Sequence, residues 1–363
     1  MQQLRPRRNA PSGGLHRKRG NEFRPIDAEQ WAIWSQGRLL LEVTRQNESG
    51  SNTLSFQVKW VLCMNTEHAS PRYSDIDLWP PGDVLEAMIE AQFAAVAATR
   101  AARPSLERAA LAMEARLRYR GRLIYVGAGT SGRLAVQDGA ELMPTFNWPE
   151  NRLILLMAGG KDALLRSVEG AEDEVEFAER LVRQHVIDGK DVVIAVAASG
   201  TTPFTLACLR QSKLRGALTI GISNNDNTPI LTEADHPIFL DTGPEPIAGS
   251  TRMKAGTAQR IALNLLSTLL MILLGRVYEG LMVDVQAVNQ KLVRRSEDML
   301  IRLTSCSREA ARDALERSNG SVKLAVLVLH GCEVDRGVRL MERAEGNLRA
   351  ALVMMRQRGS DAA

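Results

Sequence analysis

The sequence is poor in cysteine and histidine. The four cysteines, Cys63, Cys208, Cys306 and Cys332, are scattered without C-x-x-C spacing, which argues against a disulfide framework and against a zinc site. The five histidines are isolated from one another, so the sequence gives little support for a metal centre. We therefore expect a cytoplasmic protein with reduced thiols that needs neither a metal nor another cofactor.

The chain also lacks a hydrophobic run long enough to span a membrane. The longest run, Ile261–Gly275, has about 15 residues and lies between Arg260 and Arg276, whereas a span needs about 20 residues. We interpret this run as a helix buried in the core and expect no membrane association. The N-terminus is rich in Arg, Pro and Gly without an apolar segment, so the sequence predicts no signal peptide.

An excess of positive charge is confined to the beginning of the chain. Residues 1–63 carry 10 Lys/Arg and 5 Asp/Glu, which is a net charge of +5. Since the whole chain has a net charge of +4, residues 64–363 contribute −1. Nothing in the larger part therefore indicates a nucleic-acid partner. We interpret 1–63 as a basic, disordered extension, with Met64 as the expected beginning of the folded protein and a candidate translation start.

Apolar runs and helical patterns alternate through the middle of the chain. Continuous aliphatic runs predict strands near 122–126, 153–157, 192–196, 218–222 and 237–240. Helical patterns lie near 131–141, 161–185, 203–213 and 254–278. This alternation predicts an α/β fold, a parallel sheet with helices on both faces. The expected parts are helices at 64–114, the α/β domain at 115–278 and a helical C-terminal subdomain at 279–363.

Two similar segments, GRLIYVGAGTSGR (121–133) and DVVIAVAASGTTP (191–203), stand out. Each is a predicted strand that turns through small residues into a Ser/Thr cluster before a helix; no other internal repeat is visible. The hydroxyl residues are Thr130, Ser131, Ser199, Thr201 and Thr202. Such a turn aims N–H groups, hydroxyls and a positive helix end at one point, which suits a phosphate. Two of them in one sheet indicate a sugar phosphate.

Two other interpretations of the first segment stay open. Gly127, Gly129 and Gly132 also spell G-x-G-x-x-G, the dinucleotide fingerprint, although that motif alone is weak. The next predicted strand, Leu153–Met157, ends in Ala-Gly-Gly and offers no acid for a ribose. A purely structural strand–turn–helix is the second alternative.

The chain resembles the N-acetylmuramic acid 6-phosphate etherases, sugar isomerase (SIS) domain enzymes of bacterial cell-wall recycling. The resemblance covers roughly 64–355 and rests on motifs in register: GAGTSGRL (127–134), DGAE (138–141), EGAED (169–173), AASGTTPF (197–204), GSTRMKAGTAQ (249–259) and LMVDVQAVN (281–289). It implies a five-stranded flavodoxin-like sheet, a small helical C-terminal subdomain and a homodimer. A sugar-phosphate isomerase and a non-catalytic sugar-phosphate sensor on the same fold are the competing readings.

The resemblance also implies a reaction. Family members are carbon–oxygen lyases that cleave the lactyl ether of N-acetylmuramate 6-phosphate by elimination and then hydration, giving N-acetylglucosamine 6-phosphate and D-lactate. Glu141 corresponds to the acid that helps lactate leave, and Glu172 to the second acid/base. Two carboxyl groups in opposite protonation states suit such chemistry.

These two glutamates differ in how far the sequence itself supports them. Glu141 lies in an otherwise apolar helical pattern, where a carboxylate is unusual, whereas Glu172 belongs to an acidic run that is typical of a solvated helix face. Glu141 is 11 residues beyond Thr130, roughly 16 Å along a straight helix. Either the helix ends early, or Glu141 serves the phosphate loop of a neighbouring subunit.

Lys254, with Arg252, precedes the long apolar helix, where a cation could hold phosphate or the lactyl carboxylate; a surface cap is the alternative. The chain departs from the family pattern at Leu142, where a cysteine is usual, and at Thr201, where an arginine is usual. The loss of that charge puts the substrate preference in doubt.

Overall fold

The computed structural model describes residues 40–45, 54–59, 65–285 and 290–357. The chain divides into two compact units, Met1–Cys63 and Met64–Ala363. In the first, β1 (Leu40–Arg45) and β2 (Leu54–Lys59) pair antiparallel, a hairpin that the sequence analysis did not anticipate. The rest of the expected disordered extension lies outside the described residues.

The second unit is built on a parallel sheet of five strands, as predicted. Its strand order is β4-β3-β5-β6-β7. The strands are β3 (Leu123–Gly127), β4 (Leu153–Met157), β5 (Val192–Val196), β6 (Leu218–Ser223) and β7 (His236–Phe239). The direction of strand addition reverses between β3 and β5, which makes that crevice the topological switch point where such sheets bind ligands.

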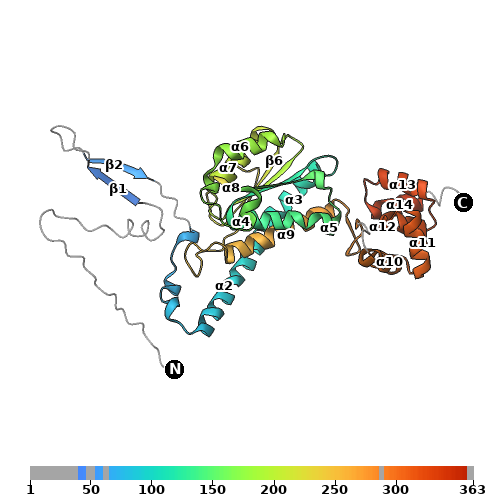
Figure 1. The fold of residues 1–363 in the computed structure, drawn as a ribbon, viewed down its shortest axis with the longest axis horizontal. Helices are drawn as coiled ribbons and strands as arrows, with labels where there is room; N and C mark the ends of the chain where they lie inside the picture. The colour runs from blue at the N-terminus through green and yellow to red at the C-terminus, as the bar shows by residue number, and fades with distance from the viewer. Residues whose placement is uncertain (1–39, 46–53, 60–64, 286–289, 358–363) are drawn as a thin grey trace, which may run out of the picture. The chain divides into compact units, whose positions relative to one another are not determined.

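Helices cover both faces of this sheet, and each face has its own hydrophobic core (Figure 1). One face is covered by α2 (Pro81–Ala101), α3 (Arg103–Leu117), α4 (Gly129–Ala140), α5 (Leu142–Phe146) and α9 (Lys254–Leu273). The other is covered by α6 (Val175–Gln184), α7 (Pro203–Leu214) and α8 (Pro229–Glu233). Successive strand residues alternate between the two cores, as the pleat requires.

The apolar run predicted as a core helix forms α9. It is long and apolar enough to cross a membrane by length and composition, but half of its most apolar window is buried. It packs against α2, α3 and α4. The prediction of a core helix is therefore confirmed, although the helix ends at Leu273 rather than 278, because Gly275 adopts a left-handed φ of 73°.

The predicted helix at 161–185 is wrong in its first half. The chain there forms two short 3-10 turns, η5 (Gly160–Leu164) and η6 (Ala171–Asp173), and only then α6. Gly160 and Gly170 have φ of 64° and 70°, a conformation that interrupts a right-handed helix. The acidic run containing Glu172 is therefore not one continuous helix face.

The C-terminal helices contain a repeat that the sequence analysis missed. A hairpin of α11 (Arg308–Arg317) and α12 (Val322–Leu329) recurs as α13 (Val334–Arg343) and α14 (Leu348–Gln357). Both turns have a left-handed residue followed by a left-handed glycine, Asn319-Gly320 and Glu345-Gly346. With α10 (Gln290–Thr304), these helices enclose a third core.

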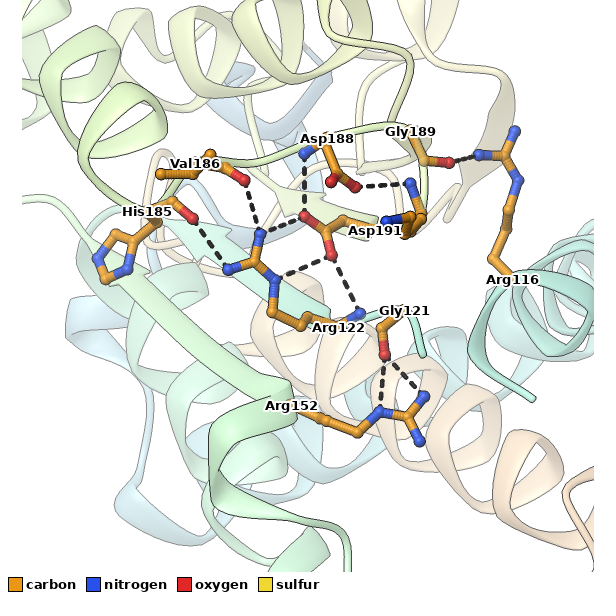
Figure 2. Close-up of polar contacts among 10 residues, drawn as sticks. Arg116, Gly121, Arg122, Arg152, His185, Val186, Asp188, Gly189 and Asp191 are labelled. Carbon is orange, nitrogen blue, oxygen red and sulfur yellow. Dashed lines mark hydrogen bonds and ion pairs between the residues drawn. The ribbon is translucent and has the colours of Figure 1, made fainter. Parts of the chain in front are cut away.

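An ion pair fixes the amino ends of the two central strands. Asp191, just before β5, accepts hydrogen bonds from the backbone N (3.1 Å) and Nε (3.0 Å) of Arg122, just before β3, and from its Nη2 (2.6 Å) (Figure 2). The Asp191 side chain is only 2% exposed. The same guanidinium donates to the carbonyls of His185 and Val186, both at 2.9 Å. One side chain thus joins two strands and the end of α6.

We expect Asp191→Ala to lower the free energy of unfolding by about 3 kcal/mol, since it leaves a partly buried guanidinium without its partner. Thermal or urea denaturation measures the change. Asp162→Ala is the control, because its pair with Arg166 is about 70% exposed on both sides and should contribute less than about 1 kcal/mol. Equal losses in the two variants would contradict the assignment.

Candidate functional site

The two Ser/Thr loops leave the sheet side by side. β3 and β5 are neighbours, and Gly127 at the end of β3 pairs with Val196 at the end of β5. The loops that follow, 128–131 and 197–202, therefore begin at the same edge of the sheet, at its switch point. This is where the fold class places ligands.

The first loop brings the start of α4 close against the end of β3. A Cβ on Gly127 would lie 2.8 Å from the Cα of Gly132, and one on Gly132 would lie 2.7 Å from the Gly127 carbonyl oxygen, so neither position accepts a larger residue. Gly129, with φ of 53°, faces open space. Thr130 is half-buried and Ser131 is buried. The first turn of α4 therefore offers backbone N–H groups and hydroxyls to an anion that approaches over Gly129.

The second loop is held by its own hydroxyls. The Ser199 Oγ accepts a hydrogen bond from the backbone N of Thr201 at 3.2 Å and lies 3.3 Å from the Thr202 Oγ1. Thr202 is the N-cap of α7, and Pro203 follows as its first residue. All three hydroxyl side chains are only half-buried, so they remain available to a ligand.

Lys254 begins α9 and is buried, which excludes the surface-cap interpretation for this residue, whereas Arg252 is exposed. Burial lowers its pKa, the charges of Glu245 and Asp241 oppose that shift, and Arg72 adds to it. The Glu245 carboxylate accepts hydrogen bonds from the backbone N of Lys254 (3.2 Å) and Ala255 (2.9 Å), so it caps α9. Among the described residues, the Lys254 ammonium forms no ion pair, which leaves its charge available to an anionic ligand.

The start of α9 also lies beside the first loop. Gly256 is so close to α4 that a Cβ there would lie 3.5 Å from the Thr130 Cγ2. Lys254, Thr130 and Ser131 therefore belong to one region at the carboxyl edge of the sheet.

Glu172 is exposed and lies in η6, on the segment that follows the carboxyl end of β4. η6 contacts α7, the helix that begins at the second loop. Arg133 holds the same segment from the other side, since its Nε and Nη2 donate to the carbonyls of Ala163 (2.9 Å) and Arg166 (3.1 Å). Arg133 is therefore a structural part of the GAGTSGR motif.

Glu141 does not meet the phosphate loops of its own chain. It is exposed and follows Ala140, the last residue of α4, while Thr130 is in the first turn of that helix. The helix does not end early, so this alternative is wrong. The buried carboxylate of the DGAE motif is Asp138, which accepts a hydrogen bond from the Tyr125 hydroxyl at 2.8 Å and pairs with Arg260 at 3.6 Å. The apolar pattern around Glu141 favours a buried position, whereas in the single chain this side chain is exposed.

Other polar residues of this edge were missed from the sequence. Asn225 follows β6, and its Nδ2 donates to the Thr66 Oγ1 and to the Ala198 carbonyl, both at 2.9 Å. The segment around Thr66 is thereby attached to the second loop. Asn225 carried the same signal as Ser199, a polar residue within three positions of the end of a buried strand, but Glu245 stands in an irregular segment without any pattern. Among the described residues, no cluster of three or more His, Cys, Asp or Glu side chains could hold a metal.

Comparisons with known proteins agree with this geometry. A SIS domain model matches 165–269, and a glucokinase regulatory protein N-terminal SIS domain model matches 106–213. The chain is 48% identical to an N-acetylmuramic acid 6-phosphate etherase of Deinococcus radiodurans over 79% of this chain and 94% of that protein. Proteins of the same name from Streptomyces avermitilis and Edwardsiella ictaluri are 41% and 42% identical over 80% of this chain and 93% and 97% of theirs.

Ser131→Ala and Ser199→Ala should each weaken the binding of a hexosamine 6-phosphate roughly tenfold, because one hydrogen bond to a charged group is lost, about 1.5 kcal/mol. Isothermal titration calorimetry measures the dissociation constant. Ser105→Ala, an exchange on α3 outside both loops, is the matched control. Unchanged affinity in both loop variants would place the phosphate elsewhere.

Proposed function

We infer that this chain, which belongs to the N-acetylmuramic acid 6-phosphate etherase family, cleaves the D-lactyl ether of N-acetylmuramic acid 6-phosphate with water. The products are N-acetylglucosamine 6-phosphate and D-lactate, and the reaction belongs to cell-wall amino-sugar recycling. The observation that carries this inference is the pair of hydroxyl loops side by side at the switch point, beside a buried lysine, in a chain so similar to its relatives.

In this proposal the 6-phosphate binds between the two loops. Thr130 and Ser131 with the N–H groups of α4 contact it from one side, and Ser199, Thr201 and Thr202 from the other. The buried ammonium of Lys254 then neutralises either the phosphate or the lactyl carboxylate. A neutral Thr201 in place of the usual arginine makes Lys254 the principal cation of the site.

We assign the reaction to the carbon–oxygen lyases. Glu172 removes the proton on C2 of the ring-opened sugar, and Glu141 protonates the lactyl oxygen as the C3–O bond breaks. Water then adds to C3 of the resulting double bond. Glu172 lies on a segment that contacts α7, the helix that begins at the second loop, which supports its role as the base. The role of Glu141 needs a further step.

We propose a homodimer in which Glu141 of one subunit completes the site of the other. Roughly 16 Å of α4 separates Glu141 from Thr130, more than one hexose phosphate bridges. α2 supplies a surface for a second copy: Leu85, Ile89, Phe93 and Val96 share one face and are 54–69% exposed. Its other face buries alanines. A stripe of large apolar side chains exposed in this way is typical of an interface.

Cytoplasmic localisation is part of the proposal. Cys208, Cys306 and Cys332 are free thiols, as expected in a reducing compartment. A sugar phosphate is likewise a metabolite of that compartment.

A non-catalytic sensor of sugar phosphates is the second candidate, favoured by the match to the glucokinase regulatory protein domain. Glu141 and Glu172 distinguish the two, because sensing needs no carboxylate at either position. Incubation of the pure protein with N-acetylmuramic acid 6-phosphate and measurement of D-lactate decides between them: a sensor binds the compound and releases nothing.

Glu141→Gln should lower kcat by roughly 10²–10⁴, the usual contribution of a general acid, while the sugar still binds. Deuterium from the solvent should still enter C2 in this variant, because Glu172 remains as the base. Glu172→Gln should block that exchange, which mass spectrometry of the recovered sugar measures. The opposite pattern would mean that the two roles are exchanged.

Mixing two inactive variants tests the shared site. One variant, Ser199→Glu, cannot bind phosphate in its own subunit. The other variant, Glu141→Gln, binds phosphate but supplies no acid. The two variants are refolded together in equal amounts, so that half of the dimers contain one subunit of each kind. If each site takes Glu141 from the partner, one of the two sites in such a dimer is intact, and the mixture should recover about a quarter of the wild-type rate. Without recovery, Glu141 acts in its own chain. Phe93→Glu added to both variants should abolish the recovery by preventing dimerisation.

A further inference from the structure

Glu141 lies at the junction of two helices, both of which pack against the sheet of the α/β domain. α4 ends before it, and α5 begins directly after it. Asp138, buried between Tyr125 and Arg260, anchors the end of α4. α5 is a single short helix with Leu142 and Phe146 buried in the core, and a residue that comes 130 positions after Phe146 donates hydrogen bonds to its far end.

That residue is Arg276, between α9 and the short hairpin of β8 (Val277–Tyr278) and β9 (Leu281–Met282). Its Nη1 donates to the carbonyls of Phe146 at 2.8 Å and Asn147 at 2.9 Å, where α5 ends. The guanidinium also lies 5.2 Å from the centre of the buried Trp148 ring. Arg276 therefore holds the end of α5 by hydrogen bonds and by a cation–π contact.

Asp284 holds Arg276, and Lys323 in turn holds Asp284. The Arg276 Nη1 pairs with the Asp284 carboxylate at 3.3 Å, and the other oxygen of Asp284 accepts from the Lys323 Nζ at 2.9 Å. The Lys323 side chain is 7% exposed, and its Nζ also donates to the Gly346 carbonyl at 2.9 Å. Lys323 belongs to α12, so the chain of contacts runs from the helical subdomain to α5.

We propose that Arg276, Asp284 and Lys323 are positioning residues through which the helical subdomain holds α5, and with it Glu141, in place for the reaction. The proposal rests on the role proposed above for Glu141. The side chains of Arg276, Asp284 and Lys323 are 15%, 25% and 7% exposed. Charges paired with so little solvent contact have fixed positions, because a displaced partner would leave an unpaired charge behind. A shift of about 1 Å in a reacting group can lower the rate 10²-fold.

The internal repeat offers a matched control. Arg349 is the second residue of α14, as Lys323 is of α12. Its guanidinium lies 4.8 Å from the centre of the Tyr278 ring, so this cation also contacts the β8–β9 hairpin. It has no hydrogen bond or ion pair to Arg276, Asp284 or α5 among the described residues.

The test compares Asp284→Asn with Arg349→Ala in the full chain. Asp284→Asn should lower kcat for D-lactate release about tenfold with KM within about twofold, and Arg349→Ala should leave both within about twofold. Hydrogen exchange at the amides of Asn147 and Trp148, which close α5 by donating to Met143 and Leu142, should accelerate about tenfold only in Asp284→Asn. Melting temperatures of both variants separate positioning from a general loss of stability.

Each outcome either supports or contradicts the positioning role of these residues. Equal effects of the two variants on kcat, or faster exchange without a change in kcat, would overturn the proposal. A wild-type protein that releases no lactate would instead refute the proposed function, and the exchange at Asn147 and Trp148 would still show whether Asp284 holds α5.

Discussion

The pairing of β3 with β5 is the interaction on which the rest of the site depends. Arg122 and Asp191 fix the amino ends of these strands with a buried carboxylate, and their carboxyl ends deliver the two hydroxyl loops. A slip of one residue would turn every side chain of β5 to the other face of the sheet and move Ser199 away from Ser131. An ion pair far from the ligand therefore maintains the geometry of the phosphate site.

The other side chains of the site are fixed by different means. Lys254 is positioned because Glu245 caps the helix that it begins, so a buried carboxylate orients the helix end and leaves the ammonium without an ion pair among the described residues. Glu172 lies in the 3-10 turn η6, and Arg133 holds the segment before this turn by donating a hydrogen bond to the Ala163 carbonyl. Glu141 depends on two anchors, Asp138 before it and Arg276 after it. In the proposed site, rigid strand ends thus hold the loops for the phosphate, and the two carboxylates lie on elements that pack against those strands.

The sheet and the hydroxyl loops could be predicted from the sequence, because a strand buried on both faces is a continuous aliphatic run that ends visibly at its first polar or glycine residue. The interruption of 161–185 could not, since isolated glycines are compatible with a helix until their φ is known. Glu245 and Asp284 form hydrogen bonds or ion pairs with residues that are distant in sequence or belong to other elements. No local sequence pattern predicts such contacts. Glu141 and Asp138 differ in burial although they are three residues apart, because α4 ends between them.

The repeat in the helical subdomain could not be predicted from the sequence, because its two hairpins share turn geometry more than residue identity. The two hairpins share their left-handed turns and a side chain that caps the next helix, Ser321 in one and Asn347 in the other. Their equivalent cations have diverged. Lys323 is buried against a carboxylate, where a compact ammonium with three donors satisfies two acceptors, whereas Arg349 stacks on an aromatic ring, which suits a planar guanidinium. The two helical hairpins thus make different contacts with the segment from Tyr278 to Asp284, and among the described residues that of Lys323 alone continues through Arg276 to the helix that follows Glu141.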